Sequence, residues 1–252
     1  MSNIKTDSLM QYPRLCAHRG FPNLAPENSV PAYEAAVAAG AHEIEYDIWS
    51  TTDGVLVSCH DPVLDRVSDG EGKIYEKTYA ELLELDFGKK FSEDFAGLKI
   101  PTFEEILQKF SGKVIMNIHI KIWDLDELDP KIPEIIELIR KYNAQDYSYI
   151  QASNDKTMPK FMEAAPDIHC ALGWNGHETG KDLVERAIKI GAHKVQFFKP
   201  HYDKEAIDLA HEHGIICNVF WSDEPQEAKE IFALGADCIL TNKYEETLEA
   251  IK

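Results

Sequence analysis

Clusters of basic residues are missing from this sequence. It contains 26 lysines and arginines against 44 aspartates and glutamates, a formal net charge of −18 that is spread along all 252 residues. Proteins that bind nucleic acids or anionic membranes do so through clustered positive charge. We therefore expect no nucleic acid binding and no stable membrane association, and an anionic substrate would need local cations.

The N-terminal region lacks a long apolar run. Its first twenty residues mix Lys5, Asp7 and Gln11 with isolated apolar side chains. They contain neither the apolar core of a signal peptide nor the roughly 20 apolar residues that span a bilayer. The default expectation is a cytoplasmic protein.

Paired cysteines and several catalytic motifs are also absent. The five cysteines are odd in number, widely spaced and set in apolar runs without any Cys-x-x-Cys, which predicts buried thiols and not disulfides or a zinc cluster: Cys16, Cys59, Cys170, Cys217 and Cys238. The sequence contains no nucleophile elbow, Walker loop or His-x-His strand motif, which argues against serine hydrolases, P-loop enzymes and amidohydrolase-type zinc enzymes. His211 and His213 point about 200° apart on a predicted helix, so they cannot share one metal.

What the sequence does contain is a regular alternation of short β-branched runs and longer amphipathic ones. Eight strands are predicted, around Leu15–Ala17, Ile44–Ile48, Val114–Ile122, Tyr147–Gln151, His169–Leu172, Val195–Phe198, Ile215–Trp221 and Cys238–Leu240. Helical patterns separate most of them. Alternation of this kind is typical of parallel strands joined by crossover helices.

A weak internal repeat supports the same architecture. The runs Gly40-Ala41-His42, Gly191-Ala192-His193 and Gly235-Ala236-Asp237 each place a glycine where a helix should end and a strand begin. We predict one (β/α)8 TIM barrel domain over residues 1–252, with an open doubly wound sheet as the alternative. Residues 61–101 interrupt the alternation after the second barrel strand, and we interpret them as a small insertion over one barrel mouth.

Two strands place polar residues where a barrel would bury them. In residues 43–48, alternation puts Glu43, Glu45 and Asp47 on one face and apolar side chains on the other. The apolar face must pack against helices, so the three acids should point into the barrel. Buried carboxylates repel one another unless a cation lies among them, which predicts a divalent metal site. The alternative is a solvated edge strand.

The strand at residues 116–122 shows the same pattern. Asn117, His119 and Lys121 share its inner face, near the C-terminal mouth where barrel enzymes have their active sites. Lys121 could contact an anion. His119 could bind a metal or bond to the acids, although a lone interior histidine is as often a satisfied core residue.

Two further histidines follow strand-like runs, His18 before Arg19 and His60 before Asp61. The turn Thr52-Asp53-Gly54 predicts a hairpin that returns His60 to the carboxylates. Two imidazoles beside a metal site suit proton transfer at neutral pH, and Arg19 and Lys121 offer charge to phosphate oxygens.

The motifs together resemble those of the glycerophosphodiester phosphodiesterase family. The resemblance is strong in the first half of the chain and weaker to the end, and it rests on runs that include His18-Arg19-Gly20, Pro26-Glu27-Asn28-Ser29, Glu45-Tyr46-Asp47-Ile48, His60-Asp61, Leu64-Asp65-Arg66 and Ile239-Leu240-Thr241-Asn242. It implies a TIM barrel that hydrolyses glycerophosphodiesters to glycerol 3-phosphate and an alcohol, a role in glycerol and lipid metabolism, and a small-molecule substrate.

The resemblance also implies roles for particular residues. His18 and His60 would be the acid/base pair, Glu45 and Asp47 metal ligands, and Arg19 and Lys121 phosphate contacts. Two positions depart from the family pattern. His119 stands where the family has a third carboxylate, which makes Mn²⁺ or Zn²⁺ more plausible than the Mg²⁺ or Ca²⁺ of the family. Trp221 lies in an altered run, so the pocket for the substrate alcohol is expected to differ.

Two other functions remain open at this point. A relative of this family could act on sugar phosphodiesters or lysophospholipids through a cyclic phosphate. A barrel that has lost its metal through the change at His119 could bind phosphodiesters without catalysis, although the retention of both histidines and both other ligands argues against it.

Overall fold

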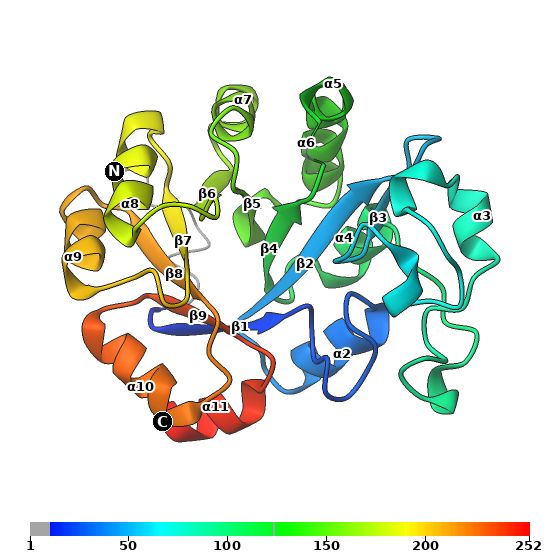
Figure 1. Cartoon of the computed structure of the whole chain (residues 1–252), viewed down its shortest axis with the longest axis horizontal. Helices are drawn as coiled ribbons and strands as arrows, with labels where there is room; N and C mark the ends of the chain where they lie inside the picture. Colours follow the sequence, from blue (N-terminus) through cyan, green and yellow to red (C-terminus); the bar gives the residue numbers. More distant parts are fainter. Residues whose placement is uncertain (1–10, 123) are drawn as a thin grey trace.

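Eight parallel strands close into a barrel in the computed structural model, which describes residues 11–122 and 124–252 (Figure 1). β1 (Arg14–His18) pairs with both β2 (Glu43–Ser50) and β9 (Cys238–Thr241), which closes the sheet. The remaining barrel strands are β4 (Ile115–Ile120), β5 (Ser148–Ala152), β6 (His169–Gly173), β7 (Lys194–Phe198) and β8 (Ile216–Phe220). All eight predicted strands are therefore confirmed, and the doubly wound sheet is wrong.

Helices surround the barrel. They are α2 (Val30–Ala38), α4 (Phe103–Phe110), α6 (Lys131–Lys141), α7 (Thr157–Ala164), α8 (Gly180–Ile190), α9 (Lys204–Glu212), α10 (Pro225–Leu234) and α11 (Tyr244–Ile251), with a short α5 (Leu125–Leu128) that the sequence did not indicate. Strand residues such as Ile44, Tyr46 and Ile118 are fully buried in the main apolar core. Within the described segments, no helix has the length and apolar character needed to cross a membrane.

The repeated Gly-Ala-His/Asp runs fasten neighbouring strands at the end of the barrel where the strands begin. Gly40, Gly191 and Gly235 adopt φ values of 76°, 75° and 110°, which glycine tolerates best. The side chain that follows each Gly-Ala pair accepts a main-chain N–H of the adjacent strand. Leu15 N donates to His42 Nδ1 at 3.0 Å, Cys170 N to His193 Nδ1 at 3.2 Å, and Cys217 N to Asp237 Oδ2 at 2.7 Å. The repeat thus fixes strand register.

The chain forms the predicted hairpin between the second barrel strand and the insertion. β3 (Leu56–Ser58) pairs antiparallel with β2, after the turn at Gly54. The chain then forms three 3₁₀ turns and one short helix: η1 (Leu64–Arg66), η2 (Ile74–Glu76), α3 (Tyr79–Leu83) and η3 (Glu93–Phe95). A separate apolar cluster that includes Trp49, Leu64 and Ile74 supports it. The hairpin and the insertion together form one side of the site described below, and His60 lies where they join.

The five cysteines are buried and free, as predicted.

Candidate active site

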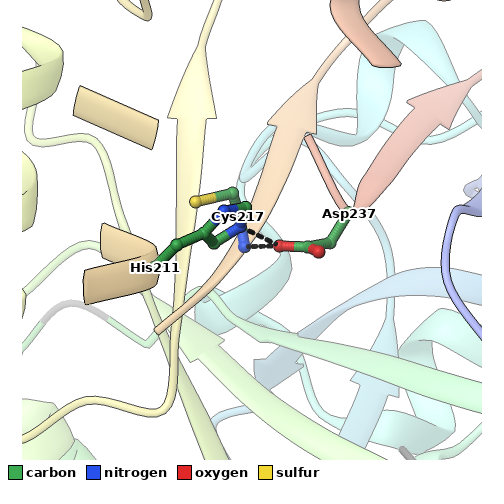
Figure 2. A group of neighbouring side chains, drawn as sticks. All are labelled: His211, Cys217 and Asp237. Carbon is green, nitrogen blue, oxygen red and sulfur yellow. Dashed lines mark hydrogen bonds and ion pairs between the residues drawn. The ribbon is translucent and has the colours of Figure 1, made fainter. Parts of the chain in front are cut away.

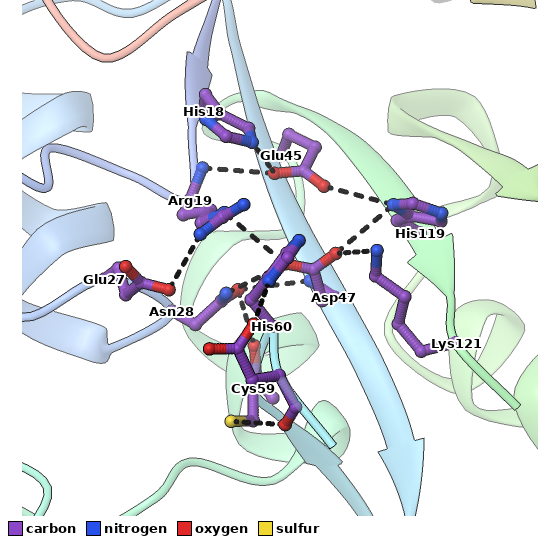
Figure 3. Close-up of polar contacts among 12 residues, drawn as sticks. His18, Arg19, Glu27, Asn28, Glu45, Asp47, Cys59, His60, His119 and Lys121 are labelled. Atoms are coloured by element: carbon purple, nitrogen blue, oxygen red, sulfur yellow. Dashed lines mark hydrogen bonds and ion pairs between the residues drawn. The ribbon is translucent and has the colours of Figure 1, made fainter. Parts of the chain in front are cut away.

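Two adjacent strands bring three potential metal ligands together inside the barrel. Register places Asp47 of β2 opposite His119 of β4, and Glu45 lies on the same face two residues earlier. His119 Nδ1 is 3.2 Å from Asp47 Oδ1 and 3.7 Å from Glu45 Oε1 (Figure 3). One ligand atom from each of the three residues lies within 4.8 Å of the others. Both carboxylates are buried and His119 is partly exposed, so the cluster opens towards the mouth.

The donor set of this cluster fits a divalent cation. Asp47 Oδ1 is buried and accepts no hydrogen bond, although Lys121 Nζ and His119 Nδ1 each lie 3.2 Å away. Burial favours the protonated carboxyl, but Lys121 and then His119 outweigh burial and hold the pKa of Asp47 well below its ordinary value. An ionised oxygen without a donor, a second carboxylate and an imidazole are typical ligands of Mn²⁺ and Zn²⁺, and carboxylates alone are typical of Mg²⁺ and Ca²⁺.

Asn28 orients Asp47, and sequence reasoning gave it no role. Its Nδ2 donates to Asp47 Oδ2 at 2.9 Å, and its Oδ1 accepts from Asp47 N at 3.1 Å. Tyr33 and Ser58 also donate to Asn28 Oδ1, at 3.0 and 3.1 Å. These contacts fix the Asn28 amide, so the free oxygen of Asp47 points towards Glu45 and His119.

Arg19 and Lys121 lie on opposite sides of the carboxylates (Figure 3). Arg19 adopts φ of 58°, and its main-chain N–H donates to Glu45 Oε2 at 3.1 Å. Its guanidinium donates to Glu27 at 2.9 Å, and its Nε, 3.9 Å from Asp47 Oδ2, is buried without a hydrogen-bond partner. Two cationic side chains therefore face one buried anionic cluster.

His18 is positioned by a chain of hydrogen bonds through Asn242 to Asp223, two residues far away in the sequence. His18 Nδ1 lies 2.8 Å from Asn242 Oδ1, and Asn242 Nδ2 donates to Asp223 Oδ2 at 2.8 Å. Asn242 N also donates to Asp223, at 2.7 Å. The other ring nitrogen, His18 Nε2, lies 3.9 Å from Glu45 Oε2. Burial lowers the pKa of His18, and the charge of Glu45 only partly offsets that effect.

His60 has a different partner. Its Nδ1 lies 2.6 Å from Asp61 Oδ1, and Arg66 bonds to the other oxygen of Asp61. Burial would raise the pKa of Asp61, but the bonds from Arg66 and His60 lower it overall. His60 is therefore paired with a carboxylate, whereas His18 is paired with an amide.

Glu43 is not part of the cluster, contrary to the expectation of three convergent acids. It is buried deeper in the barrel, where Arg14 Nη1 lies 3.2 Å from Oε1 and Tyr149 Oη donates to Oε2 at 2.7 Å. Alternation predicts which face a side chain occupies but not its depth. Two residues shift a side chain by about 6.6 Å along a strand, which is enough to exchange a metal site for an internal ion pair.

Trp221 lies in an aromatic cluster at the mouth. Its ring centroid is 5.0 Å from that of Phe220 and 6.0 Å from that of Phe198. Phe220 in turn contacts the ring of His18, with centroids 4.9 Å apart. A cavity of about 290 Å³ borders His119 and is lined by Trp174, Ser153, Asn154 and Asn175 among others. Its neutral hydrogen-bonding groups suit a hydroxyl-bearing substituent.

A second group of potential ligands, His211, Cys217 and Asp237, lies at the opposite end of the barrel (Figure 2). Asp237 Oδ2 already accepts from Cys217 N, and His211 Nε2 lies 2.9 Å from the same oxygen. Burial raises the pKa of the Cys217 thiol far above its ordinary value, so it is not a ready thiolate. The strand-fastening role described above accounts for this group.

A closed parallel barrel with acids, two histidines and two cations at its C-terminal mouth has the architecture of a barrel enzyme. A model of the glycerophosphoryl diester phosphodiesterase family matches residues 18–246. The chain therefore belongs to this family of phosphodiesterases, as the sequence motifs indicated.

A curated relative agrees with this assignment, and solved structures share the fold. The glycerophosphodiester phosphodiesterase of Caldanaerobacter subterraneus subsp. tengcongensis is 31% identical over 241 residues, covering 94% of this chain and 96% of that protein. The structure of an Oleispira antarctica phosphodiesterase in complex with the product sn-glycerol-3-phosphate has a TM-score of 0.88 at 23% identity, with 98% of both chains covered. The glycerophosphodiester phosphodiesterase of Agrobacterium tumefaciens has a TM-score of 0.78 at 22% identity, covering 95% of this chain and 99% of that one.

Proposed function

We propose that the chain hydrolyses glycerophosphodiesters to glycerol 3-phosphate and an alcohol with one divalent cation, by histidine acid/base catalysis. The observation that carries the proposal is the unequal pairing of two histidines around one ligand cluster. His18 is bonded to an amide and His60 to a carboxylate. Two imidazoles in different environments can divide the roles of base and acid between them.

Glu45, Asp47 and His119 would hold the cation, which would supply positive charge to the phosphate oxygens. Arg19 and Lys121 would share in neutralising the charge that develops in the transition state. Arg19 is already aimed at the cluster by its main-chain bond to Glu45. Lys121 reaches the same cluster through its contact with Asp47.

His18 is the base in this proposal. The amide nitrogen of Asn242 donates to Asp223, so the amide oxygen faces His18 and accepts a hydrogen bond from Nδ1–H. The Nδ1–H tautomer leaves Nε2 with a free lone pair on the side of Glu45. Nε2 would take the proton from the attacking hydroxyl, which belongs either to water or to the neighbouring hydroxyl of the substrate.

His60 is the acid. Asp61 accepts from Nδ1 and stabilises the charged imidazolium, as carboxylates do in hydrolase triads. His60 Nε2 would donate its proton to the departing alkoxide. The cavity beside His119 would hold the glycerol arm that remains on the phosphate, since its lining offers neutral hydrogen-bonding groups.

Substitution of either histidine tests the proposal. We expect His18→Ala and His60→Ala each to lower turnover of a glycerophosphodiester by about 100-fold or more, with unchanged thermal unfolding. Phosphorus NMR of the products shows whether a monoester or a cyclic diester is released. Near-normal turnover in either variant would remove that histidine from the mechanism.

A further inference from the structure

A second cavity reaches the site from the side of His60. Its volume is about 170 Å³, and it lies between the loop at residues 22–29 and the insertion. Buried Asn28, Ser58 and Cys59 belong to its lining, as does His60. A group bonded to the phosphate on the His60 side would enter this cavity.

Positive charge gathers around the cavity, although the protein as a whole is strongly acidic. Arg66, Lys90 and Lys99 line it, and the one acidic side chain among its described lining residues is Glu27. Glu27 is already engaged, because Arg19 Nη1 donates to it at 2.9 Å and Arg66 Nη2 at 2.6 Å.

The two lysines keep their charge available. Lys90 Nζ donates to the main-chain oxygen of Asp65, and Lys99 Nζ donates to that of Leu85 at 3.0 Å. In the part of the chain that the structure describes, neither ammonium group forms an ion pair with a carboxylate. A substrate group bound in this cavity would therefore lie in a net positive environment.

The other walls are apolar. Phe87, Phe91 and Ile100 also line the cavity, and Phe91 remains 43% exposed. Two phenylalanines attract a cation only weakly compared with a tryptophan cage, and the positive charges of Lys90 and Lys99 oppose that attraction.

We propose that this cavity receives the leaving alcohol and selects a neutral or anionic alcohol against a quaternary ammonium such as choline. The inference rests on the proposed function, because His60 as the acid must lie beside the leaving oxygen. Coulomb repulsion would disfavour a cationic head group, whereas the hydroxyl groups of a neutral or anionic one can accept hydrogen bonds from Lys90 or Lys99.

Two substrates that share the glycerol 3-phosphate part test the proposal: glycerophosphoglycerol and glycerophosphocholine. At low ionic strength we expect kcat/KM of the wild type to be at least about tenfold higher for glycerophosphoglycerol, and added salt to narrow this ratio. Lys90→Glu should reduce the ratio about tenfold, and Lys90→Gln should reduce it less.

Lys89→Glu provides the matched control. Lys89 is adjacent, exposed and outside the cavity lining, and it pairs with Glu93 at 3.5 Å. Lys89→Glu changes the net charge of the protein by the same amount as Lys90→Glu, but outside the cavity. It should therefore leave the substrate ratio within about twofold of wild type. The ratio also corrects each variant for its folded fraction.

A wild-type ratio near one or in favour of choline would overturn the assignment of the cavity, and so would equal effects of Lys89→Glu and Lys90→Glu, while the proposed function would stand. Failure of both substrates with every divalent cation would overturn the proposed function itself, and this inference with it.

Discussion

Removal of the Asn242 amide tests the chain of hydrogen bonds that sets the tautomer of His18. Asn242→Ala deletes two side-chain hydrogen bonds, one of 2.8 Å to the buried ring of His18 and one of 2.8 Å to Asp223 Oδ2. Asp223 keeps its bonds from Asn242 N and from Thr241 Oγ1, at 2.7 and 3.2 Å. The loop therefore keeps its main-chain anchor, and the change is confined to His18 and to the one Asp223 oxygen that loses its donor.

The expected effect on turnover follows from the bond to His18. Loss of a buried hydrogen bond costs about 1–3 kcal/mol, which corresponds to a fall in kcat of roughly 5- to 150-fold if the bond orients the base only as the reaction proceeds. KM should change little, because Asn242 contacts His18 and Asp223 and not the ligand cluster.

The pH profile separates this role from a structural one. The bond to Asn242 raises the pKa of His18, against the larger lowering by burial. Without the bond, the pKa falls further, so the acidic limb of the kcat profile should move to lower pH. Release of glycerol 3-phosphate from a glycerophosphodiester, followed across pH, measures both effects.

A second substitution pair sharpens the test. Asn242→Asp would place two carboxylates 2.8 Å apart, where the amide now donates to Asp223, and should impair both folding and turnover. The double variant Asn242→Asp/Asp223→Asn restores complementary partners and should recover much of the activity. A kcat for Asn242→Ala within about twofold of wild type would refute the reasoning.

The remaining predictions concern the partner of the acid, the strand-fastening histidines and the internal ion pair. Asp61→Asn should lower kcat by about 10-fold or more by weakening the charged form of His60, as steady-state assays would show; an unchanged rate would remove Asp61 from the mechanism. Burial lowers the pKa of His42 below its ordinary 6.5, so the folded state favours neutral His42. The contribution of neutral His42 to the free energy of unfolding is complete above pH 6.5 and is lost as the pH falls below that value. In urea titrations the free energy of unfolding should therefore decline between pH 7 and 5, and His42→Gln should reduce this decline. An identical decline in the variant would contradict the role of His42. Arg14→Met leaves Glu43 buried without its cation and should cost about 3–5 kcal/mol of unfolding free energy, whereas a smaller loss in denaturant titration would mean that Tyr149 suffices.

Sequence reasoning recovered the elements whose signal is local. The barrel strands coincide with short runs rich in apolar residues, and Gly191 and Gly235 end their helices as the repeat indicated. Period-two alternation also placed Glu45, Asp47, His119 and Lys121 inside the barrel, because the face that packs against helices must be apolar.

The missed residues act across long stretches of sequence. Asn242 contacts His18 from 224 residues away, and Asn28 contacts Asp47 from 19 residues away, with helix α2 between them. No local pattern in the sequence marks either contact. The prediction that Glu43 joins the other two acids was wrong for a related reason, because its partner Arg14 comes from the neighbouring strand β1. His42, His193 and Asp237 each bond to the main chain of an adjacent strand, so their role depends on strand register, which the sequence does not specify.

The central claim is hydrolysis of a glycerophosphodiester at the Glu45, Asp47 and His119 cluster. The most direct test follows glycerophosphoglycerol by phosphorus NMR, with metal-depleted protein and with Mg²⁺, Ca²⁺, Mn²⁺ or Zn²⁺ restored singly, for wild type and His119→Glu. We predict that wild type releases glycerol 3-phosphate only after a cation is restored, favours Mn²⁺ or Zn²⁺, and shifts towards Mg²⁺ or Ca²⁺ in the variant. Full activity without any cation, or no product in either protein with all four, would contradict the account.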